Sequence, residues 1–138
     1  MTQYLLDTNH ASPLVTLDHP LRARVLSAIR SDDIFALTTA NLAELWYGIH
    51  ALPRAPQNRL EWLRLRPAFW IYQIEERDAI DAAEIQLTLR RRGQQIGTID
   101  AMLAAVAIRY DLTLLTTDRD FDSVPGLQRT NWLPRGTS

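Results

Sequence analysis

Short apolar runs alternate with stretches of helical periodicity along this chain, and this alternation restricts the folds open to it. Apolar runs with the length and composition of strands cover residues 4–6, 34–38, 69–74, 112–117 and 127–132. Between them, apolar residues recur at helical spacing in residues 21–29, 41–51, 60–65, 79–92 and 99–110. Chains that alternate in this way place their strands in parallel, with helices on both faces. We therefore predict an α/β fold: a three-layer α/β/α sandwich with a central, mostly parallel sheet.

The size and composition of the chain predict one folded domain. Its 138 residues are enough for a single hydrophobic core, and 46% of them are hydrophobic. We assign residues 1–133 to this domain and residues 134–138 to a flexible tail. The absence of cysteine excludes disulfides, thiolate zinc sites and thiol nucleophiles, and it agrees with a reducing cytoplasm. Because the sequence shows neither a signal peptide nor an apolar stretch of membrane length, we expect a cytoplasmic protein with no membrane contact.

Four acidic residues stand where predicted strands end or predicted helices begin: Asp7, Glu44, Asp100 and Asp118. In open parallel sheets, ligands bind beyond the carboxyl ends of the strands, where Asp7 and Asp118 are predicted to lie. Carboxylates that converge at one edge repel one another unless cations neutralise them. Their oxygen atoms select Mg²⁺ or Mn²⁺ over softer metals, and such ions promote hydrolysis of phosphodiesters. The pattern predicts a divalent-metal site, with hydrolysis of nucleic acid as the matching reaction.

Each acid also has a local structural explanation. Asp7 could form a turn or cap a helix after its strand. Glu44 would complete a capping box begun by Asn41. Asp100 lies in the first turn of a helix that Thr98 would cap, where the helix dipole favours a carboxylate. The fourth acid fits a polar turn. None of these local roles explains why four carboxylates would share one end of the fold.

Four segments of the chain resemble those of a known family, the PIN-domain ribonucleases, and within it the VapC-type toxins of bacterial toxin–antitoxin pairs. The first acid lies in Leu-Leu-Asp-Thr-Asn, residues 5–9, and the second lies in residues 39–48. The third segment, the most specific, is Ile-Gly-Thr-Ile-Asp-Ala-Met-Leu-Ala-Ala, residues 96–105. The fourth is Thr-Thr-Asp-Arg-Asp-Phe, residues 116–121. Their order and spacing agree with the family over nearly the whole chain.

The resemblance implies roles for the acids. Asp7 and Asp100 would be the principal metal ligands, and Glu44 and Asp118 would complete the acidic pocket, directly or through water. These four residues would form the catalytic set. The fourth position varies in the family, so Asp120 could share or take the role of Asp118.

The resemblance also implies the rest of the machinery. Asn9 and Thr116 would orient the ligands or the substrate, and the cofactor would be Mg²⁺, with Mn²⁺ as an alternative. The reaction would be endonucleolytic cleavage of RNA by a metal-bound water, with no side-chain nucleophile. The implied partners are the RNA substrate, a cognate VapB-like antitoxin and a second copy of the chain in a homodimer. We expect the antitoxin surface on exposed aromatic residues within residues 41–65.

Three consecutive arginines, Arg90, Arg91 and Arg92, end a predicted helix just before Gly93. They are candidates for contacts with the RNA backbone. Solvated cations that complement the helix dipole are the alternative interpretation. All 15 basic residues are arginine, which codon bias explains as readily as phosphate binding.

The aromatic residues Trp46, Tyr47, Trp62 and Trp70 have apolar neighbours. We predict that they pack in the core or between helices rather than stack on bases, although some could face a partner. The three histidines lack the paired spacing of a zinc site. We expect a structural role for His10, which lies close to the first acid in the sequence.

Two other classes of protein place aspartates beyond parallel strands: receiver domains and haloacid-dehalogenase-like phosphatases. Both need a lysine, which this chain lacks, and the phosphatases also need an aspartate where Asn9 stands. Within the PIN family, the alternatives to a toxin are a nuclease of RNA processing and a catalytically inert metal-binding or interaction domain. The presence of all four acids argues against an inert domain. A short upstream reading frame for a small DNA-binding antitoxin would distinguish a toxin from a processing enzyme.

Overall fold

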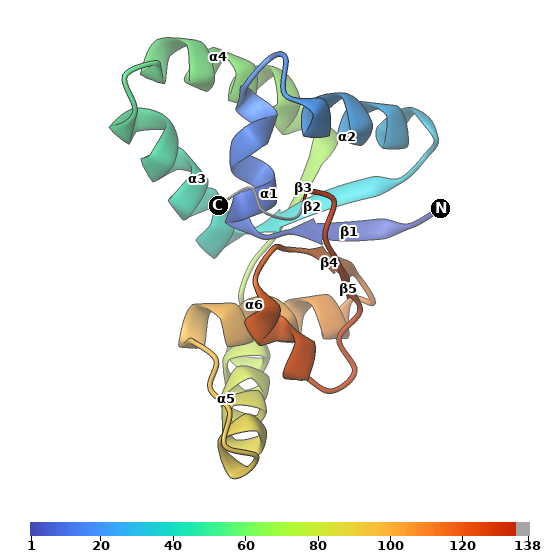
Figure 1. The fold of residues 1–138 in the computed structure, drawn as a ribbon, viewed down its shortest axis with the longest axis vertical. Helices are drawn as coiled ribbons and strands as arrows, with labels where there is room; N and C mark the ends of the chain where they lie inside the picture. The colour runs from blue at the N-terminus through green and yellow to red at the C-terminus, as the bar shows by residue number, and fades with distance from the viewer. Residues whose placement is uncertain (135–138) are drawn as a thin grey trace.

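A five-stranded sheet forms the centre of the protein in the computed structural model, which describes residues 1–134 (Figure 1). Its strands are β1 (Gln3–Leu6), β2 (Ile34–Thr38), β3 (Phe69–Tyr72), β4 (Thr113–Leu115) and β5 (Arg129–Thr130). Their spatial order is β3-β2-β1-β4-β5, and all neighbouring strands are paired in parallel. Strand β1 is therefore central: the chain passes from it to β2 and then β3 on one side, and it returns through α5 and α6 to β4 and then β5 on the other. This arrangement confirms the predicted α/β fold with a parallel sheet.

Helices cover both faces of the sheet (Figure 1). One layer contains α1 (Thr8–Ala11), α2 (Pro20–Arg30), α3 (Thr39–Ala51) and α4 (Ala55–Leu65). The opposite layer contains α5 (Glu76–Arg91) and α6 (Thr98–Arg109). Short 3-10 helices η1 (Ser12–Val15), η2 (Arg66–Ala68) and η3 (Arg119–Ser123) complete the connections. The molecule thus has the three layers that the sequence predicted.

Alternate residues of the strands supply the two hydrophobic cores. Leu6, Phe35 and Leu37 pack in the core shared with α1 to α4, whereas Leu5 and Ala36 face the core shared with α5 and α6. All five residues are 0% exposed. This follows from the two-residue period of a strand, which sends successive side chains to opposite faces. Complete burial of a leucine side chain contributes roughly 2 kcal/mol, so the sheet is anchored from both sides.

Two helix caps differ from the predictions. The hydroxyl of Thr38 caps α3 by accepting a hydrogen bond from the backbone N–H of Asn41 at 3.2 Å, so the helix begins at Thr39. The predicted cap, Asn41, instead lies inside the first turn. Helix α6 follows Gly97, which has no capping side chain, and Thr98 is its first residue rather than its cap. In the first case, the last residue of strand β2 caps the helix, so the end of the strand fixes where the helix begins.

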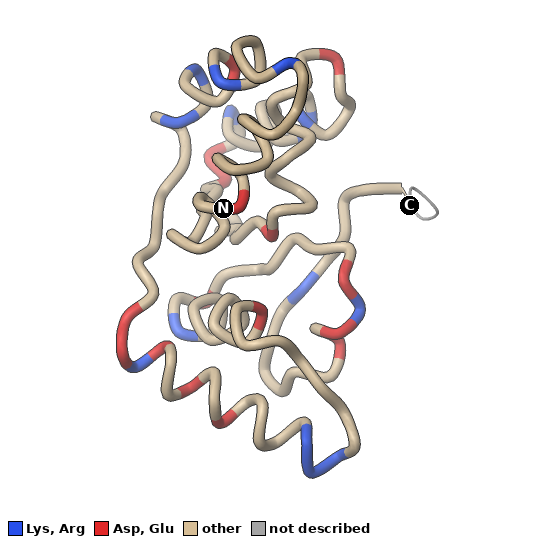
Figure 2. The backbone as a smooth tube through the Cα atoms, turned by 90° about the vertical axis from the view of Figure 1, so that its left-hand side faces the viewer, with Lys and Arg blue, Asp and Glu red and all other residues tan. Residues whose placement is uncertain are grey.

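Helix α5 has an acidic beginning and a basic end, which Figure 2 shows along its backbone. Glu76 and Asp78 lie in its first turn, and Arg90 and Arg91 lie in its last turn. This order complements the helix dipole at both ends. Gly93 follows with a φ of 72°, a conformation that glycine adopts without steric cost. The predicted end of this helix at Gly93 is therefore correct.

The prediction that the aromatic residues pack inside was right for only one of them. Trp62 is 3% exposed. Trp46, Tyr47 and Trp70 are 42%, 77% and 63% exposed, so the prediction of a core position was wrong for them, whereas the exposed aromatic residues expected within residues 41–65 include Trp46 and Tyr47. Apolar sequence neighbours could not show this, because a helix buries only one of its faces and β3 is an edge strand.

None of the helices within residues 1–134 has the length and apolar character needed to cross a membrane. The predicted tail begins at Pro134, and its remaining residues, 135–138, lie outside the part of the chain that the structure describes.

Candidate active site

Asp7 directly follows the central strand β1 and is held by several hydrogen bonds. Its backbone N–H donates to the carbonyl of Leu115 at 2.9 Å, which continues the pairing with β4. Its Oδ1 accepts from the backbone N–H of Thr8 at 2.8 Å. Its Oδ2 accepts from the Thr116 hydroxyl at 2.8 Å and from Asn9 Nδ2 at 3.2 Å. These donors compensate for the burial of the carboxylate, which is 9% exposed, and they fix its orientation.

Behind Asp7, the side chains of Asn9 and His10 form a hydrogen-bonded chain. His10 Nε2 accepts from the backbone N–H of Trp132 at 3.0 Å, so the imidazole proton is on Nδ1. Nδ1 then donates to Asn9 Oδ1 at 2.7 Å, and this oxygen also accepts from the backbone N–H of Thr117 at 3.2 Å. Because both donors occupy Oδ1, the Asn9 amide directs its Nδ2 toward Asp7. Burial, together with the charges of nearby arginines, lowers the pKa of His10 to about 4, so the ring is neutral at neutral pH.

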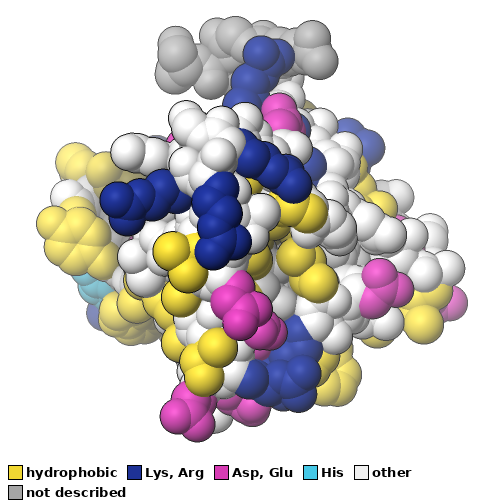
Figure 3. Space-filling model, turned by 90° about the horizontal axis from the view of Figure 1, so that it is seen from below, with side chains coloured by type: hydrophobic (Ala, Val, Ile, Leu, Met, Phe, Trp, Pro, Cys, Tyr) yellow, Lys and Arg dark blue, Asp and Glu magenta, His cyan; other side chains and the backbone are white. Residues whose placement is uncertain are grey.

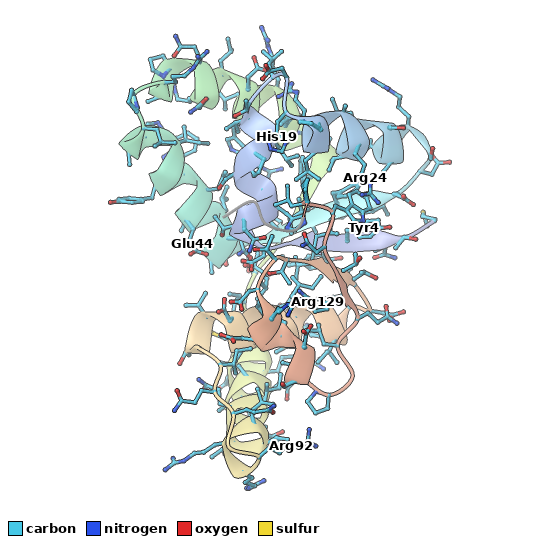
Figure 4. All side chains as sticks on the ribbon, viewed as in Figure 1. Tyr4, His19, Arg24, Glu44, Arg92 and Arg129 are labelled. Carbon is cyan, nitrogen blue, oxygen red and sulfur yellow. The ribbon has the colours of Figure 1, made fainter. Side chains whose placement is uncertain are left out.

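Glu44 projects from α3 and is joined to α1 through Thr8. The Thr8 hydroxyl donates to Glu44 Oε1 at 2.9 Å and accepts from Asn41 Nδ2 at 3.2 Å. Asn41 Oδ1 in turn accepts from the Thr38 hydroxyl at 2.6 Å. Glu44 lies beyond the first turn of α3, so the capping-box explanation for this residue was wrong. Its position beside α1, at the end of the sheet, is visible in Figure 4.

Asp100 lies in the first turn of α6. A Cβ atom added to Gly97 would lie 3.9 Å from Asp100 Oδ2, so the carboxylate is close to the preceding loop. Within residues 1–134, no donor forms a hydrogen bond to this carboxylate. Burial raises the pKa of Asp100 to about 6, and like charges add to the effect; in falling order they are Asp7, Asp118, Glu44 and Asp120. The structure therefore brings the predicted acids close enough together for their charges to interact.

Asp118 and Asp120 share one short turn. Asp118 Oδ1 accepts from the backbone N–H of Asp120 at 2.9 Å, and the backbone N–H of Asp118 donates to the Thr116 hydroxyl at 3.0 Å. Arg129 steadies the same turn by donating to the Asp118 carbonyl at 3.3 Å. Asp118 has a stronger effect on the pKa of Asp100 than Asp120 has. Of the two alternatives for the fourth acid, Asp118 therefore has the stronger electrostatic coupling to the site.

Thr116 connects the two strands that meet at this edge. Its hydroxyl donates to Asp7 Oδ2, accepts from the Asp118 backbone N–H at 3.0 Å, and lies 3.4 Å from the Asn9 amide nitrogen. Thr116 is 0% exposed, so it acts on the site through these neighbours. Sequence reasoning missed the corresponding role of Thr8, although this residue stands within the Asp-Thr-Asn motif that carries the first acid.

The donor set at this edge fits a hard divalent cation. All of its charged groups are carboxylates, which are the ligands that Mg²⁺ and Mn²⁺ prefer. Burial and the like charges of the neighbouring acids raise the pKa of Asp100, and a bound cation would favour its charged form. Among residues 1–134, no three His, Cys, Asp or Glu side chains are already arranged as a formed metal site. The residues therefore fit such an ion by their chemistry, and ligation would require their side chains to draw together.

The predicted RNA-binding arginines lie at the C-terminal end of α5. Arg92 is at the end of α5 distant from Glu44 in Figure 4. Arg90 lines a cleft whose other lining residues include Gly97 and Asp120. Of the three arginines, Arg90 is thus connected with the acidic site by a continuous surface feature.

The fold, the order of the four acids and a match to a family model define the class of this protein. The model, described as PIN domain, matches residues 4–127. The chain belongs to the PIN-domain family, as the sequence motifs indicated.

Three similar proteins, two of them of known structure, each match most of the chain. It is 25% identical to Ribonuclease VapC2 of Rickettsia felis over 130 residues, which cover 94% of this chain and 97% of the relative. It is 26% identical to a chain of FitAcB from Neisseria gonorrhoeae, with a TM-score of 0.75 over 93% of this chain and 96% of that chain. A chain of VapBC2 from Rickettsia felis, solved with a promoter DNA fragment, has 24% identity and a TM-score of 0.82 over 96% and 100% of the two chains. This last likeness shows the shared fold.

Proposed function

We propose that this protein is a divalent-metal-dependent endoribonuclease that hydrolyses phosphodiester bonds in RNA as the toxin of a toxin–antitoxin pair. The observation that carries the proposal is the gathering of Asp7, Glu44, Asp100 and Asp118 at the carboxyl edge of a PIN-domain sheet, where the charges of the other three raise the pKa of Asp100. The similarity to a ribonuclease of the VapC type supports RNA as the substrate. We place this activity in the cytoplasm.

Asp7 and Asp100 would hold the ion, with Glu44 and Asp118 completing its surroundings. When bound, Mg²⁺ or Mn²⁺ would activate a water for attack on phosphorus and offset the negative charge of the phosphate. The protein contributes alignment. Thr116 and Asn9 keep one oxygen of Asp7 fixed, while the Thr8 hydroxyl positions Glu44. Asp120 would assist from the rim of the site.

An antitoxin similar to VapB is the proposed protein partner. Several solved relatives are VapBC assemblies, including one from Salmonella typhimurium described as DNA-bound. On this chain, Trp46 and Tyr47 are exposed, and two adjoining hollows of about 400 and 510 Å³ share Ala43 and Trp46 in their walls. Such an apolar surface suits an amphipathic segment of a partner. We also propose that the chain forms a homodimer, which light scattering of the purified protein would test.

The nuclease function is tested by cleavage of RNA with added Mg²⁺ or Mn²⁺. We expect Asp100→Asn to reduce the cleavage rate on the order of a hundredfold or more, as for loss of a key electrostatic group, with an unchanged circular dichroism spectrum. Asp81→Asn removes an exposed acid from α5 and serves as the matched control. Cleavage by Asp100→Asn at the wild-type rate, or cleavage that persists in excess chelator, would refute the proposal.

The toxin role needs a separate experiment. Expression of the wild-type protein should arrest growth. We expect an adjacent reading frame to encode the VapB-like antitoxin, whose co-expression should restore growth. Asp100→Asn should be harmless in the same cells. Harmless expression of an active nuclease would favour a role in RNA processing.

A further inference from the structure

A cleft of about 810 Å³ lies between the second half of α5, the loop before α6 and the turn that carries Asp120. Its polar lining residues include Gln86, Arg90, Gln94 and Gln95. Figure 3 looks onto the end of the molecule that contains α5 and α6 and shows arginine side chains beside hydrophobic ones on this face. Apart from Asp120, the residues that line this cleft have no role in the proposed reaction.

One end of the cleft adjoins the acidic site. Gly97 lines the cleft, and a Cβ atom at this position would lie 3.9 Å from Asp100 Oδ2. Asp120 also lines the cleft, and its charge contributes to the raised pKa of Asp100. A polymer chain whose scissile phosphate reaches the acids can therefore continue directly into the cleft.

The side chains in the cleft differ in how they are held. Gln86 Nε2 donates to the Ile96 carbonyl at 3.1 Å and to the Thr98 hydroxyl at 3.2 Å, so it fixes the wall that leads to α6. Gln94 and Gln95 are exposed, and their side chains form no hydrogen bond within residues 1–134. The cleft thus combines a rigid wall with amide groups that are available to a ligand.

The chemistry of these groups fits single-stranded RNA. Neutral amides donate and accept hydrogen bonds as base edges do, and they do not repel phosphate. The Arg90 guanidinium can neutralise a backbone phosphate. Leu87, which is 49% exposed, adds apolar surface against which a base or ribose can pack.

We propose that this cleft binds the nucleotides adjoining the scissile phosphate, with Arg90 on the RNA backbone and Gln94 and Gln95 on base edges. The two glutamines are then determinants of the cleavage sequence. This inference rests on the proposed ribonuclease function, because the acids define where the scissile phosphate lies.

Binding is tested in the Asp100→Asn background, where RNA stays intact. Fluorescence anisotropy with a labelled single-stranded RNA, in Mg²⁺ and at several salt concentrations, should show about tenfold weaker binding for Arg90→Gln. The slope of log affinity against log salt should fall by about one. Arg77→Gln makes the same charge change on the exposed first turn of α5 and should bind like the parent protein. Equal affinities and salt slopes for the Arg90 and Arg77 variants would overturn the proposal.

Sequence selection is tested in the cleavage-competent protein. Sequencing of RNA ends from a randomised RNA pool should show a different or broader cut-site preference for Gln94→Ala/Gln95→Ala than for wild type. Both side chains are exposed, and thermal unfolding should confirm an intact fold. An unchanged preference would overturn the assigned role of the glutamines.

If the Arg90 variant binds RNA normally but changes the sedimentation of the protein, the cleft is a subunit interface and the proposal fails. If wild type cleaves no RNA, the proposed function itself fails, so the two failures are distinguishable.

Discussion

Asp7 and Asp100 are held in opposite ways at the same edge of the sheet. Asp7 accepts hydrogen bonds from Thr8, Asn9 and Thr116. The Asp100 carboxylate has no hydrogen-bond donor within the described part of the chain, and its pKa is raised to about 6. Burial and the neighbouring acids thus both disfavour the charged form of Asp100. This residue is a sensitive reporter of any charge that enters the site.

Replacing Asp100 by asparagine is expected to raise the free energy of unfolding of the metal-free protein at pH 7 to 8. The pKa of this carboxyl is 3.8 in the unfolded reference and about 6 in the folded protein. The folded state therefore binds more protons between these values, and wild-type stability falls as pH rises through them. Urea unfolding with chelator present should show a higher unfolding free energy for Asp100→Asn than for wild type. This difference should be largest above pH 6 and should shrink as pH falls toward 4. A gain that is independent of pH, or a loss at pH 8, would contradict this origin.

His10 is expected to give the opposite pH dependence. Its pKa falls from 6.5 to about 4 on folding. The contribution of the neutral His10 ring to the unfolding free energy is therefore complete above pH 6.5 and is lost as pH falls toward 4. The full effect corresponds to as much as about 3 kcal/mol. His10→Asn can still donate to Asn9 but cannot titrate, so its unfolding free energy should fall less between pH 7 and 5. His50→Asn, at an exposed position, is the control and should keep the wild-type slope. A wild-type slope in His10→Asn would assign the pH dependence to another group.

At the scale of elements, periodicity located the helices and strands, but it did not locate their caps. Thr38 and Asn41 are both good capping residues, and the sequence alone favoured the second. Thr38 caps α3 because β2 extends to this residue, where it pairs in register with Tyr72 of β3. That choice depends on a contact between strands distant in sequence, which local propensity does not contain.

The junction between α6 and β4 offers a test of backbone strain. Asp111 lies within this connection and has a φ of 55°, in the left-handed region that glycine occupies most easily. In Asp111→Gly, relief of this strain should raise the unfolding free energy by about 0.5 to 1 kcal/mol. The greater conformational entropy of glycine in the unfolded chain offsets part of this gain. Asp111→Ala should lower it, because alanine has the same steric cost without a polar side chain. Chemical denaturation of the two variants gives the comparison, and equal stabilities would show that the turn is unstrained.

At the scale of the whole molecule, the sequence indicated Asn9 and Thr116 as groups that orient the acids, but it did not indicate the contacts that Thr8 and Trp132 make. The ends of β1 and β4 placed Asp7 and Asp118 together, since parallel strands finish at the same edge. The bond from Thr8 to Glu44 joins residues 36 positions apart, and the contact from Trp132 to His10 spans 122 positions. Such contacts depend on how the layers close on the sheet. No local pattern in the sequence indicates them.

A cation at this edge would join the two helical layers, because Glu44 comes from α3 on one face and Asp100 from α6 on the other. Binding to the folded state alone stabilises it by RT ln(1 + [L]/Kd), which is about 2.7 kcal/mol when the ion is at 100 times its Kd. Differential scanning calorimetry at constant ionic strength should therefore show a rising Tm for wild type with Mn²⁺ or Mg²⁺. Asp7→Asn and Asp100→Asn should lose most of this rise, although Asp100→Asn begins from a higher Tm without metal. Asp81→Asn, which changes an exposed acid on α5, should keep the full rise. Equal rises in all four proteins would mean that the ions act by general screening, and the assignment of the carboxylates as a shared cation site would then be wrong.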